Sequence, residues 1–291
     1  MLSQILNILF SGILLGMVYA VAALGLSLTM GIMGVVNVSH SAFVMLGSFL
    51  ALELLERLGV DPIASFFIAL PLFFATGALV YQVIVRRVER AQQTQGLVAL
   101  FGLMVLIESL GTMVWTTNTR VITSSYSNAH LTIAGATLAS VSLIAGALAL
   151  VLLAAFWVFL RYTLTGRAIR AMGQDRAAAR SLGVDVGRLS TIMFGLGIAS
   201  AGAAGVAIGM VFPFAPQTQI QWLAWAFLIV VLGGMGKVEN TLAAALFVGL
   251  VQAIATSLLP FDYVYLMLYA GLAVVLVVRR EGLVGANRRM I

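Results

Sequence analysis

Long apolar segments separated by short polar ones run along the whole of this 291-residue chain. No Asp, Glu, Lys or Arg precedes Glu53, and none occurs from Leu189 to Gly236. About 20 apolar residues are enough for a helix to cross a bilayer, so the gaps between charges locate the membrane-spanning segments. They predict nine helices, over residues 3–24, 41–57, 62–85, 96–115, 140–160, 190–211, 221–236, 241–259 and 263–279. Residues 25–40 either continue the first helix or dip into the membrane and return.

This pattern predicts an all-α polytopic membrane protein with 8–10 transmembrane helices and one transmembrane domain over residues 1–291. Composition agrees, because 62% of the residues are hydrophobic and only 9% are charged, against roughly 25% charged residues in soluble domains. Mean hydropathy is +1.10. These values exclude a soluble enzyme, a disordered chain and a nucleic-acid-binding protein. The absence of cysteine excludes disulfides, a thiolate nucleophile and a Cys-ligated metal.

Basic residues predict the orientation in the membrane. Of the 16 Lys and Arg residues, 14 fall in segments 86–90, 161–188 and 279–289 or at Lys237, and the other two are Arg57 and Arg120. If nine helices alternate, those 14 share one side, which the positive-inside rule makes cytoplasmic. The C-terminus is then cytoplasmic and the N-terminus lies outside. The first apolar run has neither a basic segment before it nor a cleavage site after it, so no cleaved signal peptide is expected.

Motifs for chemistry are missing. The string GGMGKV at 233–238 lacks the first glycine of a phosphate-binding loop, and Val238 follows Lys237 where Ser or Thr is needed. The chain has no HExxH, no GxSxG and only two histidines, His40 and His130. We therefore expect no catalytic residue, no metal and no cofactor in this chain.

Segment 31–43, GIMGVVNVSHSAF, is the most polar stretch at the membrane end of an apolar run. Its polar residues are Asn37, Ser39, His40 and Ser41. Polar groups at this depth must be satisfied by protein or face a water-filled path. The segment is either a helix break that lines a translocation path or an ordinary turn whose side chains cap the helix starting near Ser41.

Glu108 is the only acidic residue inside the predicted helix 96–115. A carboxylate at a helix centre costs roughly 3 kcal/mol to insert. Glu108 is therefore interpreted either as a residue of the translocation path or as a hydrogen-bonded packing residue.

The loop 161–189 gives the sharpest local signal. Asp175 can cap a short helix over 176–182, and Gly183 can end it in a left-handed conformation. Arg176 and Arg180 lie on one face, while Ala178, Ala179 and Leu182 supply a small apolar surface. Such a helix suits docking onto another protein, and the alternative is a basic loop held by anionic lipid.

Glycines predict close helix packing. Two GxxxG pairs, Gly12 with Gly16 and Gly205 with Gly209, suit a close approach of two backbones. At an offset of 202, Gly31, Met33, Gly34, Val36, Ala42 and Gly47 match Gly233, Met235, Gly236, Val238, Ala244 and Gly249. Such paired, glycine-interrupted segments mark the path in many transporters. The alternative is that Gly233, Gly234 and Gly236 only permit close packing.

Three segments resemble one family. Residues 25–51 (GLSLTMGIMGVVNVSHSAFVMLGSFLA), 166–189 (GRAIRAMGQDRAAARSLGVDVGRL) and 230–250 (VVLGGMGKVENTLAAALFVGL) are similar to ABC importer permeases of the branched-chain amino-acid class, the LivH-type subunits. Ser41 stands where that family often has Gly. In the second segment, Ala178, Ala179 and Gly183 fit the Ala–Ala–x–x–x–Gly core of the ATPase-contacting loop, although Ala177 stands where the motif has Glu.

The resemblance implies an ABC importer permease fold in the bacterial inner membrane and a division of labour among subunits. A second homologous permease subunit completes the path, a periplasmic or extracellular binding protein captures the substrate, and two cytoplasmic ATPases hold ATP and Mg²⁺. It further implies that the coupling loop comprises Gly166, Arg167, Arg170, Asp175, Arg176, Ala178, Ala179, Arg180 and Gly183. Membrane lipid is a further expected partner, and nucleic acid is not.

Two other functions remain open from the residues. A secondary transporter would need a coupling site, for which only Glu108 and His40 are candidates, and a membrane enzyme would need a polar cluster that the sequence lacks. Within the resembling family, substrates include branched-chain amino acids, urea, amides and aromatic acids.

Overall fold

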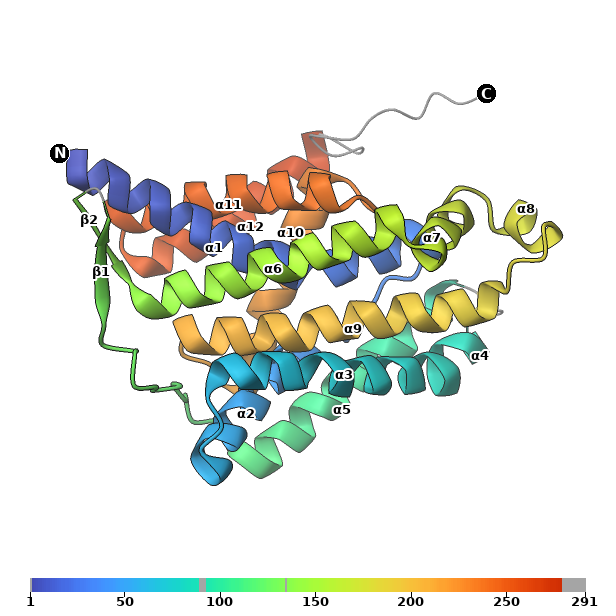
Figure 1. The fold of residues 1–291 in the computed structure, drawn as a ribbon, viewed down its shortest axis with the longest axis horizontal. Coiled ribbons are helices and arrows are strands. Elements are labelled where there is room, and N and C mark those ends of the chain that lie inside the picture. The colour runs from blue at the N-terminus through green and yellow to red at the C-terminus, as the bar shows by residue number, and fades with distance from the viewer. Residues whose placement is uncertain (1, 89–92, 134, 279–291) are drawn as a thin grey trace.

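The computed structural model describes residues 2–88, 93–133 and 135–278 as a bundle of helices. Each of the nine predicted helices overlaps one long helix of the structure (Figure 1). These are α1 (Leu2–Leu28), α2 (His40–Leu58), α3 (Pro62–Val80), α5 (Gln93–Trp115), α6 (Ser140–Tyr162), α9 (Val186–Val211), α10 (Gln219–Gly233), α11 (Val238–Leu258) and α12 (Phe261–Val278). The all-α polytopic class is thus confirmed.

Among the described residues, six helices are long and apolar enough to cross a membrane. They comprise α1, α3, α5, α6, α9 and α11, with α1 and α3 extended to Met33 and Val88 by their following turns. Two of the remaining helices are less suited to cross a membrane. Helix α2 carries Glu53, Glu56 and Arg57 in its last turns, and α10 has only 15 residues. The count of eight to ten crossings stays a prediction.

Successive long helices run in alternating directions between two ends of the bundle (Figure 1). One end, here the inner end, carries three short helices, α4 (Arg86–Val88), α7 (Leu164–Gln174) and α8 (Arg176–Ser181). The other, the outer end, carries the N-terminus and a hairpin of β1 (His130–Ile133) and β2 (Ala136–Ala139). The basic segments 86–88 and 161–188 gather at the inner end, while residues 279–291 lie outside the described residues.

The first helix continues past the predicted residue 24. It ends in a π-helical turn, Thr29–Met33, and Gly34 then takes a left-handed conformation with φ 69°. Residues 35–39 have no helical structure and turn back into the bundle. The first residue of α2 shows this, since Nε2 of His40 lies 2.7 Å from the backbone oxygen of Ala22. Ala22 is 11 residues before the end of that turn, or roughly 16 Å at 1.5 Å per residue. α2 therefore starts deep inside the bundle.

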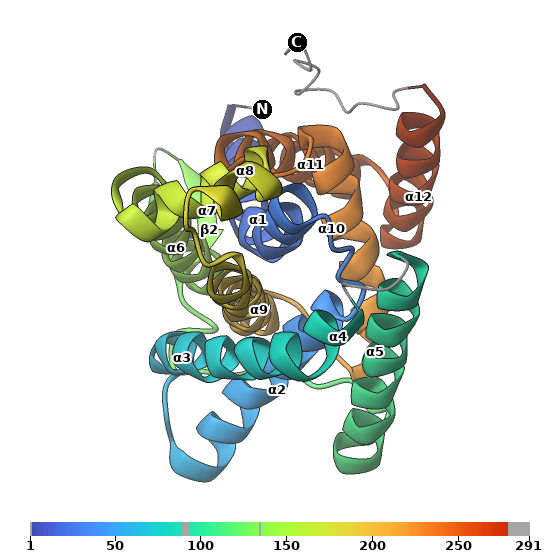
Figure 2. The same cartoon turned by 90° about the vertical axis from the view of Figure 1, so that its right-hand side faces the viewer.

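Helix α9 occupies the centre, between α1, α6, α3 and α2 (Figure 2). Its small residues allow this, since a methyl group on Gly205 would overlap the backbone oxygen of Val44 in α2. The first GxxxG pair similarly seats α1 on α11, where a methyl group on Gly16 would lie 2.7 Å from Cα of Leu246. Both pairs therefore find their partners within this chain, and close backbone approach holds the bundle together.

Candidate functional site

The polar segment at the start of α2 is buried inside the bundle. Asn37, Ser39, His40 and Ser41 are each at most 1% exposed. The hydroxyl of Ser39 donates to Oδ1 of Asn37 at 2.7 Å, and the Ser39 side chain makes no capping hydrogen bond to the helix. Because a carbonyl oxygen only accepts, the contact with Ala22 requires that Nε2 of His40 carry a hydrogen. The segment is thus joined to α1 and does not act as an ordinary side-chain cap.

Three polar atoms of this segment have no hydrogen-bond partner among the described residues. They are Nδ2 of Asn37, Nδ1 of His40 and Oγ of Ser41. Buried polar groups are nearly always paired, and each exception calls for a physical explanation. Irregular backbone at membrane depth is tolerated where it is enclosed by protein or lines a cavity. The segment combines unpaired buried polar atoms with irregular backbone, which makes it a candidate functional site.

Glu108 lies apart from that segment, in the last third of α5. Its Oε2 accepts a hydrogen bond of 2.7 Å from Nε2 of Gln219, the first residue of α10. Gln219 is fully buried, and its Oε1 has no partner among the described residues. The pair links two helices near the outer end. This geometry corresponds to the hydrogen-bonded packing role considered for Glu108.

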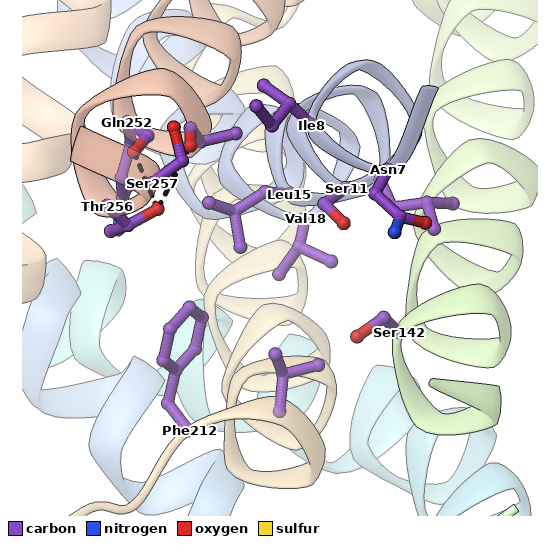
Figure 3. Close-up of a pocket in the computed structure, with 13 residues that line it drawn as sticks. Asn7, Ile8, Ser11, Leu15, Val18, Ser142, Phe212, Gln252, Thr256 and Ser257 are labelled. Atoms are coloured by element: carbon purple, nitrogen blue, oxygen red, sulfur yellow. Dashed lines mark hydrogen bonds between the residues drawn. The ribbon is translucent and has the colours of Figure 1, made fainter. Parts of the chain in front are cut away.

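A cavity of about 350 Å³ lies in the outer half of the bundle (Figure 3). Four helices form its wall, namely α1, α6, α9 and α11. Polar side chains from three of them, including Ser11, Ser142 and Thr256, stand around it, with Phe212 closing one side. No charged side chain is among the residues that line it. Its mixed wall of neutral hydrogen-bonding groups and apolar surface can accept a small amphiphilic solute.

Sequence reasoning missed this cavity. The signal was a polar residue repeated at four-residue spacing in otherwise apolar helices, in Asn7 with Ser11 and in Gln252 with Thr256. Gln252 is fixed from behind, because its Oε1 accepts a hydrogen bond of 2.6 Å from the Tyr19 hydroxyl. The ring of Tyr19 in turn stacks on Trp225 at 5.1 Å. The position of this wall is therefore held by buried aromatic packing.

The loop between α6 and α9 contains two helices where the sequence predicted one. The additional helix, α7, begins at a Thr163 side chain that accepts a 2.9 Å hydrogen bond from the backbone N–H of Gly166. It packs on the inner end of the bundle through Gly166, Ile169 and Met172. Arg167 and Arg170 are exposed on it. The spacing of its buried residues follows one helical face, which is the signal that was overlooked.

The predicted short helix is α8. Asp175 caps it by accepting hydrogen bonds of 2.8 and 2.9 Å from the backbone N–H groups of Ala177 and Ala178. Gly183 follows it with φ 83°, in the left-handed region. Figure 1 shows α8 projecting from the inner end, beyond the rest of the bundle.

The outward face of α8 differs from the expected one. Ala179 is 5% exposed and lies against the chain, whereas Ala177 and Ala178 are exposed and Leu182 is 84% exposed. Arg176 points inward, since its Nη2 donates to Oγ of Ser190 at 2.9 Å. Arg180 is exposed. The apolar surface offered to another molecule thus comes from Ala177, Ala178 and Leu182, and Arg176 anchors α8 to α9.

The two matched glycine segments meet at the inner end. A methyl group on Gly31 would overlap the backbone of Gly236, which has φ 90°. The N–H of Gly236 donates to the backbone oxygen of Ser27 at 3.1 Å, and Thr241 Oγ1 donates to Ser27 Oγ at 2.8 Å. Of the neighbouring glycines, Gly233 abuts Asn240 and Gly234 has φ 76°. These contacts close the bundle between α1 and the α10–α11 loop.

Comparison with known proteins assigns this architecture to a family. Residues 8–277 match a family model described as the permease component of branched-chain amino acid transport systems. The high-affinity branched-chain amino acid transport system permease protein LivH of Escherichia coli K12 is 26% identical over 95% of this chain and 94% of its own. LivH of Salmonella typhimurium is 27% identical and BraD of Pseudomonas aeruginosa 24%, each over 95% of this chain and 94% of the relative. No solved structure matches the chain.

Proposed function

This chain belongs to the family of permease components of branched-chain amino acid transport systems, and from that premise we propose that it forms half of the translocation path of an ATP-driven importer. A second permease subunit supplies the other half. The inner end faces the cytoplasm, with the C-terminus on that side, and two ATPases bind there. The outer end receives substrate from a binding protein. The transported solute is a branched-chain or related amino acid.

The observation that carries this proposal is the position of α8. A six-residue helix capped by Asp175 extends beyond the bundle and presents Ala178 and Leu182 to the surroundings. An exposed helix with a small apolar surface at the end of the bundle suits a partner groove, which would transmit closure of the ATPases to the helices. Arg176 ties α8 to α9, the central helix, so a displacement of α8 would reach the centre of the bundle.

The outer cavity and the polar segment support a path with no fixed charge. Neutral Ser, Thr, Asn and Gln side chains line the cavity together with Leu, Val and Phe. A zwitterionic amino acid has zero net charge, so hydrogen-bonding groups can hold its polar end while apolar side chains contact its branched end. The buried polar segment 37–41 would then become accessible only in a second conformation.

Reconstitution tests the proposal. The chain is incorporated into liposomes alone, then together with a second permease, two ATPases and a binding protein of the same family of transport systems. Uptake of radiolabelled leucine, urea and benzoate is measured in both preparations. We expect ATP-dependent leucine uptake by the complete set and none by the single chain. Transport by the single chain would refute the importer and support a secondary transporter. Uptake of urea or benzoate in place of leucine would refute the proposed substrate alone.

A further inference from the structure

A second cavity, of about 730 Å³, opens at the inner end of the bundle. Its wall combines the end of α6, the helix α7 and the loop between α10 and α11. Three basic residues line it, Arg161, Arg170 and Lys237, against a single carboxylate, Glu239. All three basic residues are exposed.

Among the described residues, none of the three basic side chains of this inner cavity forms an ion pair with a carboxylate. Within the described part of the chain, the only ion pair joins Arg57 and Glu53, at the outer end. The Glu239 carboxylate accepts a 2.8 Å hydrogen bond from Nε1 of Trp157. The Arg161 guanidinium lies over the rings of Trp157 and Tyr162, at 5.0 and 5.8 Å from their centroids. Guanidinium groups held in this way are well suited to pair with phosphate oxygens.

The surroundings of the cavity are those of a membrane–water boundary. Trp and Tyr with nearby Arg or Lys are typical of this level of a membrane protein. On the membrane side of Arg161, α6 exposes Val151 and Val158, at 57% and 47%. Leu164, at the start of α7, is 80% exposed. Apolar surface therefore continues directly from the basic cavity along α6.

We propose that the inner cavity binds the phosphate of an anionic glycerophospholipid, with the acyl chains lying on the exposed apolar face of α6. Basic pockets between membrane helices on the cytoplasmic side bind such headgroups. The proposal uses the cytoplasmic orientation of the inner end and otherwise goes beyond the transport function. It gives the two helices of the loop 161–189 different roles: α7 helps to hold the lipid, whereas α8 docks onto the ATPase.

Lipid titration of the purified full-length chain tests this site. Binding of short-chain phosphatidylglycerol, phosphatidylcholine and inorganic phosphate is followed by native mass spectrometry. We expect phosphatidylglycerol to bind at least about tenfold more tightly than phosphatidylcholine. The double variant Arg161→Gln/Arg170→Gln should lose about 30-fold in phosphatidylglycerol affinity, because each basic residue contributes about 1 kcal/mol and a tenfold change is about 1.4 kcal/mol.

A matched control removes the same charge outside the cavity. Arg167→Gln/Arg180→Gln should keep the wild-type affinity, since both residues are exposed in the same loop but do not line the cavity. If the first double variant does not fold, Lys237→Gln alone should lower the affinity about fivefold.

Equal binding of the two lipids, or an equal loss in the control variant, would overturn the proposal. Binding of inorganic phosphate as tight as that of phosphatidylglycerol would identify a site for a free anion instead. Since binding is measured on the purified chain without transport, either result leaves the importer proposal untouched.

Discussion

At the residue scale, the neighbouring residues Ala178 and Ala179 differ in exposure. They are adjacent alanines in α8, yet Ala178 is exposed and Ala179 is buried. The sequence alone gave them the same docking role, because a helix of six residues does not reveal which face rests on the chain. A bulky substitution therefore has a different meaning at each position.

Ala178→Trp should block docking of the ATPase while leaving the bundle intact. Its side chain would enter the partner groove, where overpacking costs about 2 kcal/mol, or about 30-fold in affinity. Ala179→Trp should instead displace α8, because its side chain would overpack a buried position, and destabilise the loop by about 1–3 kcal/mol. Copurification of the ATPase measures the first effect and limited proteolysis of the loop the second. Intact copurification with Ala178→Trp would contradict the docking role.

Cysteines introduced at positions 37 and 40 should react with a water-soluble thiol reagent only during turnover. The chain has no native cysteine, so Asn37→Cys and His40→Cys each provide a single thiol. Both positions are buried in the present conformation, whereas Ser11→Cys in the outer cavity is exposed and should react at once. Labelling is compared with and without ATP in the assembled complex. Failure to label at 37 and 40 in every nucleotide state would exclude them from the path.

Tyr126 should stabilise the outer end except in strong alkali. Its hydroxyl donates to Oδ1 of Asp61 at 3.0 Å, and the same oxygen caps α3 by accepting from Ile63 N–H. Burial, followed by the neighbouring Asp61, raises the pKa of Tyr126 from 10.0 to about 12. A raised pKa means that the contribution is complete below pH 10 and is lost as pH rises through 12.

Thermal unfolding in detergent checks this expectation. Tyr126→Phe should be about 1–2 kcal/mol less stable at pH 7, because a hydrogen bond to a carboxylate is lost. The difference between wild type and variant should shrink as pH rises from 10 to 12. A constant difference over that range would show that the hydroxyl is not responsible.

At the element scale, glycine seams position the helices. Gly205→Ala should separate α9 from α2 and destabilise the bundle by about 1–3 kcal/mol, because the added methyl group would overlap the Val44 backbone oxygen. Gly102→Ala in α5 is the matched control, since no atom outside its own helix turn lies within 4 Å of the added methyl group. It should stabilise α5 by about 0.5–1 kcal/mol. Denaturant unfolding should show that the free energy of unfolding falls in Gly205→Ala and rises in Gly102→Ala, relative to the wild type.

The long helices were predictable because few charged residues interrupt their apolar runs. The ends of α8 were predictable because Asp175 and Gly183 act locally, as an N-terminal cap and a left-handed residue. The hairpin at 130–139 was not predicted, since its strands hold only four residue pairs in a Thr/Ser-rich loop. The outer cavity was also missed, because it brings together residues as distant as Ser11 and Thr256. Local chemistry reveals helix ends, whereas a cavity depends on how whole helices pack.

At the scale of the whole molecule, the two cavities lie at opposite ends of α1. The outer cavity contacts Ser11 and Val18, and the inner cavity contacts Gly31 and Ile32. Between them α1 is completely buried from Val18 to Thr29. In this conformation a buried stretch of α1 therefore separates the two cavities.

The central position of α9 has a consequence for how the protein is made. Of the six helices that are long and apolar enough to cross a membrane, it has the lowest mean hydropathy, 1.8, and the largest share of buried residues, 89%. The long helices packed around it, α1, α2, α3 and α6, all precede it in the chain. Because the chain is synthesised from its N-terminus, these four helices would already be present when α9 leaves the insertion machinery. Helix α9 would then be covered by protein on insertion, and α10 and α11 would be added afterwards against α1.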